Sequence, residues 1–283
     1  MNEIPSFQEE KDYIRLLETL IKVAEANKDT ALGEDDRFLE AEGLCKKFIG
    51  HTASVLYLFR STTLPDVTDR CISFFDAGSI NVLSRAALES FLVFHYVFIE
   101  PQLDNEKDFR YYSWRYASYI DKQKFPSRTE EGKRQITDEK KTIDDLKEKI
   151  NNNSFFKQLD EKKKEKLLNG QWRLKFWKEI GMSAGLSEIL AKQFYGHLCA
   201  YAHSGCQSAQ QVGNAETAET QKAICIATMK LIMIVMANMI KAYCQMFVKS
   251  NDVLQKDEDA KKLIDKWVNI GTSLQNEFRA FIK

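Results

Sequence analysis

The chain has 283 residues and carries 41 basic and 41 acidic side chains, so its formal net charge is zero. That length allows one large helical domain or two small ones. The balanced charge excludes an overall positive charge of the kind that attracts nucleic acid, although it permits a local basic patch. Six cysteines are scattered without a CxxC pair, which favours buried thiols in a reducing compartment over a disulfide framework. The polar N-terminus, MNEIPSFQEEKDY, lacks the apolar core of a signal peptide. We therefore expect a cytoplasmic protein.

The first third of the chain shows helical periodicity. Apolar residues at helical spacing predict amphipathic helices over residues 7–28 and 35–60, followed by a break at residues 62–66. Residues 67–99 predict a further helix or helix pair. From Ile80 to Ile99 nearly every residue is apolar or small, so we expect neighbours on most sides of this segment.

The middle of the chain is more polar. Residues 104–123 predict an aromatic amphipathic helix, and residues 128–169 mix both charge signs around a narrow stripe of four apolar residues, Ile136, Ile143, Leu146 and Ile150. A coiled-coil partner site and a solvated helical arm or hairpin both fit that stripe. We favour the arm, because the stripe is only about two heptads long.

Residues 171–187, QWRLKFWKEIGMSAGLS, predict a linker in which two tryptophans alternate with basic residues. Such a mixture can stack nucleotides. It more often anchors a loop onto the core, and we favour that interpretation. Helices over residues 187–203, 215–250 and 257–281 complete the predicted elements.

The segment AICIATMKLIMIVMANMIKAYCQMFV, residues 223–248, is long and apolar enough to cross a bilayer. Lys230 lies near its middle and Lys241 follows, and a charge at bilayer depth is costly. We therefore expect a buried central helix and no membrane partner.

Because strand alternation persists nowhere, the sequence predicts an all-α fold. We expect a single domain over residues 1–283, a bundle of about seven to nine helices with residues 80–99 and 223–248 at its centre and the charged arm 128–169 within it.

A polar stripe crosses the apolar segment NVLSRAALESFLVFHY, residues 81–96. Asn81, Arg85 and Glu89 are spaced i, i+4 and i+8, and each step of four residues turns the helix by only about 40°. The arginine and the glutamate can pair one turn apart. An internal salt bridge that joins helices and the wall of a functional cleft both fit this pattern.

The stretch FYGHLCAYAHSG, residues 194–205, concentrates polar aromatic side chains on a short helix. His197 and His203 are six residues apart and so point about 120° away from each other, which excludes the i, i+4 clamp of an HExxH zinc site. Zinc bound by Cys199, His203 and Cys206 would require a bend in the chain and lacks a fourth ligand. We therefore predict no metal site and no cofactor.

Gly205 is a natural C-cap, which places His203 in the last turn of this helix. There the helix dipole favours a protonated ring. A pH-sensitive histidine and an ordinary helix-end histidine bonded to a carbonyl both fit that position.

Three motifs in this order carry a resemblance: SRAALE at 84–89, DFRYYSWRYASY at 108–119 and YGHLCAYAHS at 195–204. Together they resemble a bacterial family of all-helical proteins of unknown function, over roughly residues 40–250. That family is distantly similar to HEPN-type helical bundles, which are common in toxin–antitoxin and phage-defence systems.

Many HEPN proteins are metal-independent ribonucleases built on an Arg-x4–6-His motif. Here His197 stands where that arginine would precede His203, so Arg85 must come from another helix and lie close to His203. The resemblance then implies a catalytic site in which Arg85 and Glu89 position RNA, while His203, Tyr195 and His197 act on it.

The broken motif leads us to expect a non-catalytic interaction module of a defence or toxin-like system, with a protein partner. The alternative is a HEPN-like ribonuclease that uses Arg85 and His203 on RNA. The resemblance also implies a homodimer, because HEPN-like proteins often build sites across a two-fold axis.

Overall fold

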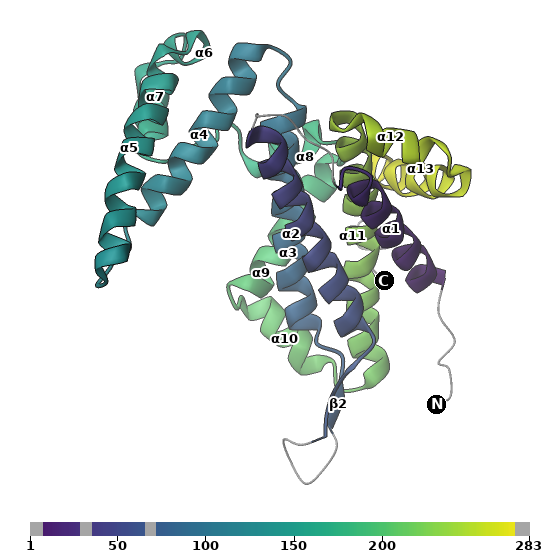
Figure 1. The fold of residues 1–283 in the computed structure, drawn as a ribbon. Helices are drawn as coiled ribbons and strands as arrows, with labels where there is room; N and C mark the ends of the chain where they lie inside the picture. The colour runs from purple at the N-terminus through teal and green to yellow at the C-terminus, as the bar shows by residue number, and fades with distance from the viewer. Residues whose placement is uncertain (1–7, 29–35, 66–71, 275–283) are drawn as a thin grey trace. The chain divides into compact units, whose positions relative to one another are not determined.

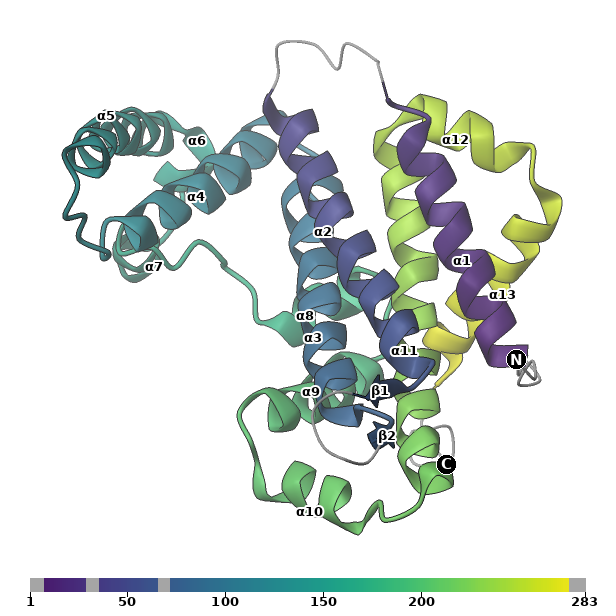
Figure 2. The same ribbon diagram turned by 60° about the horizontal axis from the view of Figure 1, so that its bottom comes forward.

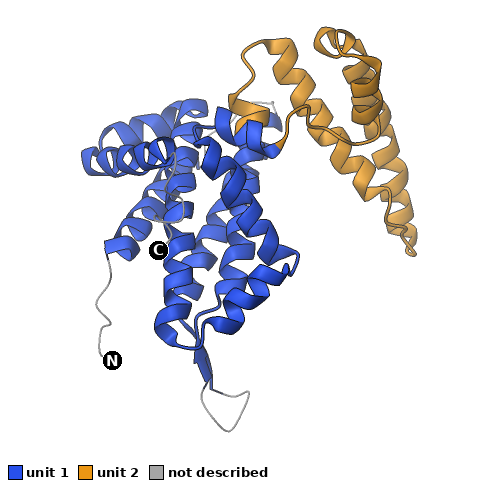
Figure 3. Cartoon of the chain, turned by 180° about the vertical axis from the view of Figure 1, so that it is seen from behind, with its two compact units in different colours: residues 1–94, 177–283 blue, residues 95–176 orange. Residues whose placement is uncertain are grey.

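The computed structural model describes residues 8–28, 36–65 and 72–274. Within these ranges the chain is almost entirely helical, which confirms the all-α prediction (Figure 1). The described residues form thirteen α-helices, two π-helical turns and one two-stranded hairpin, so the prediction of seven to nine helices is wrong. The sequence predicts one domain over residues 1–283, and the structure groups the chain into two compact units. Unit 1 contains residues 1–94 and 177–283, and unit 2 contains residues 95–176 (Figure 3).

Most elements belong to unit 1. Its long helices are α1 (Gln8–Glu25), α2 (Asp36–Phe59), α3 (Ala77–Phe94), α11 (Ala218–Met246) and α13 (Glu258–Ser273). Its short elements are β1 (Thr62–Leu64), β2 (Ile72–Phe74), α8 (Trp177–Ser183), the π-helical turn η2 (Leu190–Phe194), α9 (Tyr195–Ala202), α10 (Cys206–Asn214) and α12 (Val248–Gln255).

Helix α11 lies at the centre of unit 1, where it packs against α1, α3 and α13 (Figure 2). An uninterrupted run of its residues, from Leu231 to Ile240, is buried, as the apolar composition predicts. Lys230 forms an ion pair with Glu9 at 3.6 Å, and Lys241 forms one with Asp265 at 3.6 Å. The two lysines are thus accommodated by acidic partners on the helices that surround α11.

Among the described residues, two helical stretches are long and apolar enough to cross a membrane, residues 77–99 and 218–246. Core helices pass the same test of length and composition. In the second stretch 72% of the most apolar window is buried inside the protein, so α11 packs as a core helix does.

The hairpin departs from the predicted helix at residues 67–99. Strands β1 and β2 pair antiparallel, with Thr63 opposite Ser73, and α3 begins only at Ala77. Each strand has three residues, which is too short for alternation to be recognised in the sequence. Residues 67–71 of the predicted helix lie outside the described part of the chain.

Unit 2 is a set of helices around its own small core. It contains the π-helical turn η1 (His95–Ile99), α4 (Asp104–Lys122), α5 (Glu130–Asn152), α6 (Ser154–Lys157) and α7 (Glu161–Leu168). The predicted apolar stripe of α5 packs against α4: Leu146 and Ile150 are buried in a cluster with Phe109 and Tyr116, and Ile143 packs against it. The charged segment 128–169 is therefore a set of helices that supplies one wall of this core.

The extra helices of unit 2 begin at side-chain caps within the charged segment. The side chain of Asn153 accepts hydrogen bonds from the backbone at the start of α6, and Asp160 accepts one from the backbone N–H of Lys163 at the start of α7. Each cap satisfies backbone donors that a helix leaves unpaired at its first turn. Short helices of this kind add to the count without extending any long apolar pattern.

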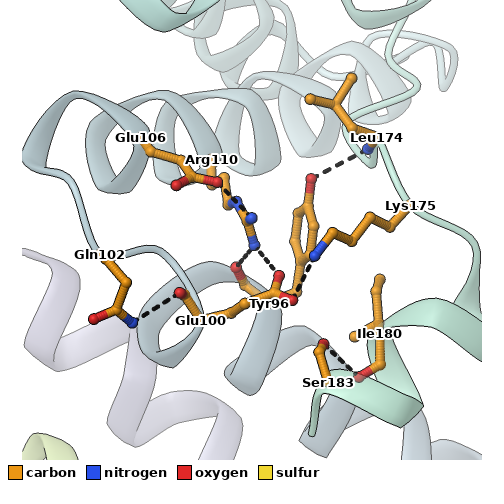
Figure 4. Close-up of polar contacts among 9 residues, drawn as sticks. All are labelled: Tyr96, Glu100, Gln102, Glu106, Arg110, Leu174, Lys175, Ile180 and Ser183. Carbon is orange, nitrogen blue, oxygen red and sulfur yellow. Dashed lines mark hydrogen bonds and ion pairs between the residues drawn. The ribbon is translucent and has the colours of Figure 1, made fainter.

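An ion network holds the last segment of unit 2 (Figure 4). The guanidinium of Arg110 pairs with Glu100 and with Glu106, and it donates to the backbone oxygen of Tyr96 at 2.8 Å. Lys175 Nζ pairs with Glu100 at 2.6 Å, and the backbone N–H of Leu174 donates to the Tyr96 hydroxyl at 3.1 Å. The segment that precedes α8 is thereby fixed to η1 and α4, as the anchoring interpretation of residues 171–187 predicts.

Candidate functional site

The polar stripe on α3 separates into two parts with different surroundings. Asn81 is fully buried, where its amide nitrogen donates to the oxygen of Ala77 at 2.8 Å and its amide oxygen accepts from the Thr228 hydroxyl at 3.0 Å. It therefore joins α3 to α11 and takes no part in an accessible site. Arg85 and Glu89, one and two turns further on, remain partly accessible to solvent.

Arg85 and Glu89 form an ion pair at the edge of the core. Arg85 Nε donates to Glu89 Oε1 at 3.1 Å, and the two side chains are 21% and 33% exposed. Burial on its own lowers the pKa of Arg85, but Glu89, Tyr195 and Cys199 together outweigh burial and raise the pKa above its usual value. The pair thus keeps a fixed cation within reach of solvent.

His203 is presented by the turn that ends α9. The turn is a Schellman motif, in which the N–H of Gly205 donates to the oxygen of Ala200 at 2.7 Å and the N–H of Ser204 to the oxygen of Tyr201 at 3.3 Å. Ser204 takes the left-handed position, with φ of 53°, so the prediction that Gly205 serves as this cap is off by one residue. Gly205 has φ of −60° and is the N-cap of α10, and a Cβ there would lie 3.2 Å from the Ala200 oxygen.

The structure brings Arg85 and His203 into direct contact. Arg85 Nη1 and His203 Nε2 lie 3.1 Å apart, although the residues are 118 positions apart in the chain. An arginine N–H can only donate, so Nε2 is the acceptor and we assign the ring proton to Nδ1. The contact follows from the packing of α3 against α9, and His203 itself is exposed.

Tyr195 completes the cluster from the first position of α9. Its hydroxyl donates to Glu89 Oε1 at 3.0 Å, and the guanidinium of Arg85 lies 5.7 Å from the centre of its ring. Trp177 packs beside the tyrosine with 6.2 Å between the ring centres. Burial, and after it the Glu89 carboxylate, raises the pKa of Tyr195 to about 12, so its phenol is protonated at neutral pH.

His197 does not join these four residues. Its ring packs edge-on against Tyr201 with 5.2 Å between ring centres, and burial lowers its pKa. None of its contacts in the described part of the chain is with Arg85, Glu89 or His203. The helical spacing that separates the two histidines by about 120° accounts for this placement.

The cluster is therefore made of Arg85, Glu89, Tyr195 and His203, and Trp177 supports it. Sequence reasoning missed that support, although Trp177 lies in the aromatic stretch 171–187. Chemically, the cluster combines a fixed cation, a carboxylate, a protonated phenol and a solvent-exposed imidazole. These are the groups that transfer protons and stabilise negative charge at a phosphate ester.

The described residues include no group of side chains that could bind a metal ion. Across residues 8–28, 36–65 and 72–274 no three His, Cys, Asp or Glu side chains lie close enough to hold an ion. Cys199 and Cys206 are free thiols, half-buried and exposed respectively, and they form no zinc site with His203.

Comparison with known protein families gives a match over the middle of the chain. Residues 74–220, just over half of the chain, match a family described as Family of unknown function (DUF5677). No curated protein matches the chain, and no solved structure does. The matched range contains all four residues of the cluster.

Proposed function

This chain belongs to the Family of unknown function (DUF5677), and we propose a function for it from the cluster. Arg85, Glu89, Tyr195 and His203 form a HEPN-like, RNA-directed site that cleaves RNA without a metal ion. The observation that carries the proposal is the 3.1 Å contact between Arg85 Nη1 and His203 Nε2. It brings a permanent cation and a proton acceptor together at the protein surface from two different helices.

The reaction that this pair would catalyse is cleavage of an RNA strand by the 2′-hydroxyl of a ribonucleotide. When a substrate phosphate draws the Arg85 guanidinium away from His203 Nε2, that nitrogen accepts the proton of the ribose 2′-hydroxyl, and the 2′-oxygen then forms a bond to phosphorus. The bond from phosphorus to the 5′-oxygen breaks, which leaves a 2′,3′-cyclic phosphate and a 5′-hydroxyl. Arg85 stabilises the negative charge that develops on the phosphoryl oxygens.

Of the two remaining side chains, one positions the guanidinium and the other protonates the leaving oxygen. Glu89 holds the guanidinium through Nε, which leaves the Nη side of the guanidinium to contact His203 and a substrate phosphate. Tyr195 is protonated at neutral pH. Its hydroxyl donates to Glu89 in the free protein, and rotation of the hydroxyl would let it donate to the departing 5′-oxygen instead. His197 is left out of this scheme, because its ring packs against Tyr201.

A second candidate is a non-catalytic interaction module of a defence or toxin-like system in the bacterial cytoplasm, as the HEPN resemblance implies. The ion pair favours it, because Glu89 already neutralises Arg85. In that case the cluster fixes the packing of α3 against α9, and a protein partner binds elsewhere. The homodimer that the resemblance implies stays a prediction for either candidate.

The experiment that separates the candidates measures RNA cleavage in the presence of EDTA. We expect wild type to cut single-stranded RNA and to leave DNA of the same sequence intact, since DNA lacks the 2′-hydroxyl. Arg85→Ala and His203→Ala each lower the rate by about 100-fold or more, the scale of one acid–base or charge-stabilising group.

The matched control is Arg60→Ala, which removes another arginine from unit 1 that pairs with a glutamate, Glu10 at 3.0 Å. Its cleavage rate should equal that of wild type. Equal rates from all four proteins would refute the ribonuclease and support the interaction module.

A further inference from the structure

A cavity of about 450 Å³ lies within unit 2, beside the end of α7 and the segment that follows it. This volume is within the range of pockets that hold small organic ligands. The lining residues that matter here are basic or aromatic: Lys163, Lys166, Trp172, Arg173, Lys175 and Phe176. No acidic side chain is among the lining residues of this cavity.

The basic side chains of this cavity differ in how they are paired. Lys163 pairs with Asp160 at 2.9 Å, and Lys175 pairs with Glu100 at 2.6 Å. Lys166 is exposed and has no ion pair within the described ranges. The cavity therefore has positive charges on its wall, while the carboxylates that balance some of them lie outside the lining. Such a wall attracts a phosphate.

The aromatic side chains supply surfaces for a planar ligand. Trp172 packs edge-on against Tyr96 with 5.7 Å between ring centres, and the guanidinium of Arg173 lies 5.8 Å from the Trp172 ring. Phe176 is 79% exposed at the end of the same segment. Aromatic rings placed between basic side chains stack nucleic-acid bases without regard to base identity.

The wall is fixed before any ligand binds. Tyr96 and Glu100 hold the backbone of Leu174 and the side chain of Lys175, and Glu100 is itself held by Arg110 (Figure 4). Gly170, with φ of 88°, makes the turn between α7 and this segment. A pre-ordered wall lowers the entropic cost of binding.

We propose that this cavity binds a phosphorylated nucleobase, with the phosphate at Lys163 and Lys166 and the base against Trp172 or Phe176. The ligand is either a free nucleotide or one residue of single-stranded RNA, which share this chemistry. The proposal does not depend on the Arg85 cluster, and it gives the sequence QWRLKF a role beyond anchoring.

The test uses the full chain and two probes, a fluorescent eight-residue 2′-O-methyl oligouridylate, which lacks the free 2′-hydroxyl needed for cleavage, and ATP without metal. Binding is followed by anisotropy for the oligomer and by calorimetry for ATP. The double variant Lys163→Ala, Lys166→Ala and the single variant Phe176→Ala should each weaken binding of the preferred probe by about 10-fold or more, as loss of phosphate or stacking contacts does. Affinity should also fall as salt is added.

Two matched controls belong to unit 2 and lie outside the cavity lining. Lys162→Ala removes an exposed lysine from the same helix, and Phe125→Ala removes a ring that is 74% exposed. Neither should change the affinity. ATP binding identifies a free nucleotide, and oligomer binding alone identifies an RNA strand.

Three outcomes would overturn the inference. They are failure of both probes to bind at millimolar concentration, equal losses in the control variants, and competition by inorganic phosphate as strong as that by ATP. ATP contains no internucleotide bond for the Arg85 cluster to cleave, so its binding to the full chain reports on this cavity and not on cleavage. Failure here is therefore distinguishable from failure of the cleavage proposal.

Discussion

Arg110 is the most deeply buried guanidinium described in unit 2, and its environment explains how a charge is tolerated there. Its side chain is 7% exposed and lies between two carboxylates, those of Glu100 and Glu106. The guanidinium also lies 4.1 Å from the centre of the Tyr96 ring. Burial alone lowers the pKa of Arg110, but its hydrogen bond to Glu100 raises it, so the residue stays charged.

Replacing Arg110 with Ala should lower the free energy of unfolding by about 3–5 kcal/mol, because the partly buried carboxylates of Glu100 and Glu106 both lose the guanidinium charge. Urea denaturation followed by circular dichroism measures this loss. The control is Lys124→Ala, since Lys124 and Asp121 form an exposed pair that is 66% and 68% accessible. It should cost less than about 1 kcal/mol. Similar losses in the two variants would show that the buried network does not stabilise unit 2.

At this scale the sequence indicates Arg85 and Glu89 well, because charges on an apolar helix are costly unless they are paired. It also indicates His203, which a helix end leaves exposed. It does not reveal that Tyr195 donates to Glu89, since that contact depends on how α9 packs against α3. His197 was predicted to join the site, although the spacing of the two histidines already separates their directions.

Helix α13 approaches α11 very closely at Gly271. A Cβ at this position would lie 2.4 Å from Cγ2 of Ile234, which is itself 1% exposed in the core. Real side chains do not tolerate this separation, so the glycine permits the packing of the two helices.

Gly271→Ala should therefore destabilise unit 1 by about 1–3 kcal/mol, the usual cost of overpacking a core. Gly43→Ala should do the opposite and stabilise by about 0.5–1 kcal/mol, because Gly43 lies on the exposed face of α2 with nothing within 4 Å of an added Cβ. Thermal and urea unfolding of both variants measure the difference. A neutral or stabilising Gly271→Ala would mean that the helices can separate at no cost.

Long helices could be predicted from the sequence, because each buries a stripe that repeats with the helical period. Short elements could not be predicted in this way. The π-helical turn η2 changes the angular step just before Tyr195, so a uniform helical projection misplaces the residues that follow. The helices α6, α7 and α10 have four, eight and nine residues, too few to show a period.

At the scale of the whole molecule, the described cysteines differ in how deeply they are buried. Cys45, Cys225 and Cys244 are buried, and burial raises the pKa of each thiol to about 12. Cys206 is a free thiol on the exposed surface of α10. Because the thiolate is the reactive form, the buried thiols should be inert at neutral pH.

Labelling with iodoacetamide at pH 8 should modify Cys206 before Cys45, Cys225 and Cys244, which should stay unmodified until the fold opens. Raising the pH to 9 should not change this order, since all three buried thiols remain protonated well below pH 12. Peptide mass spectrometry reads each site separately, and labelling in urea provides the fully reactive reference. Early modification of Cys225 or Cys244 would contradict the burial of α11.

The division into two units has no counterpart in the composition of the chain. Helix α3 continues directly into η1 at the first junction, and no Pro- or Gly-rich linker marks it. A unit inserted within another therefore leaves no signal of the kind that indicates a domain boundary. The sequence predicts a helical arm over the charged segment, and the core that this segment shares with α4 depends on contacts between distant residues.

The central claim is that Arg85 and His203, from two different helices, act as one site on RNA. A double-mutant cycle tests it most directly: RNA binding and cleavage are measured for wild type, Arg85→Ala, His203→Ala and the double variant. We predict strong coupling, with the double variant little worse than the weaker single variant, because residues that act as a unit are not additive. Independent losses that multiply, or no loss in either single variant, would contradict the claim.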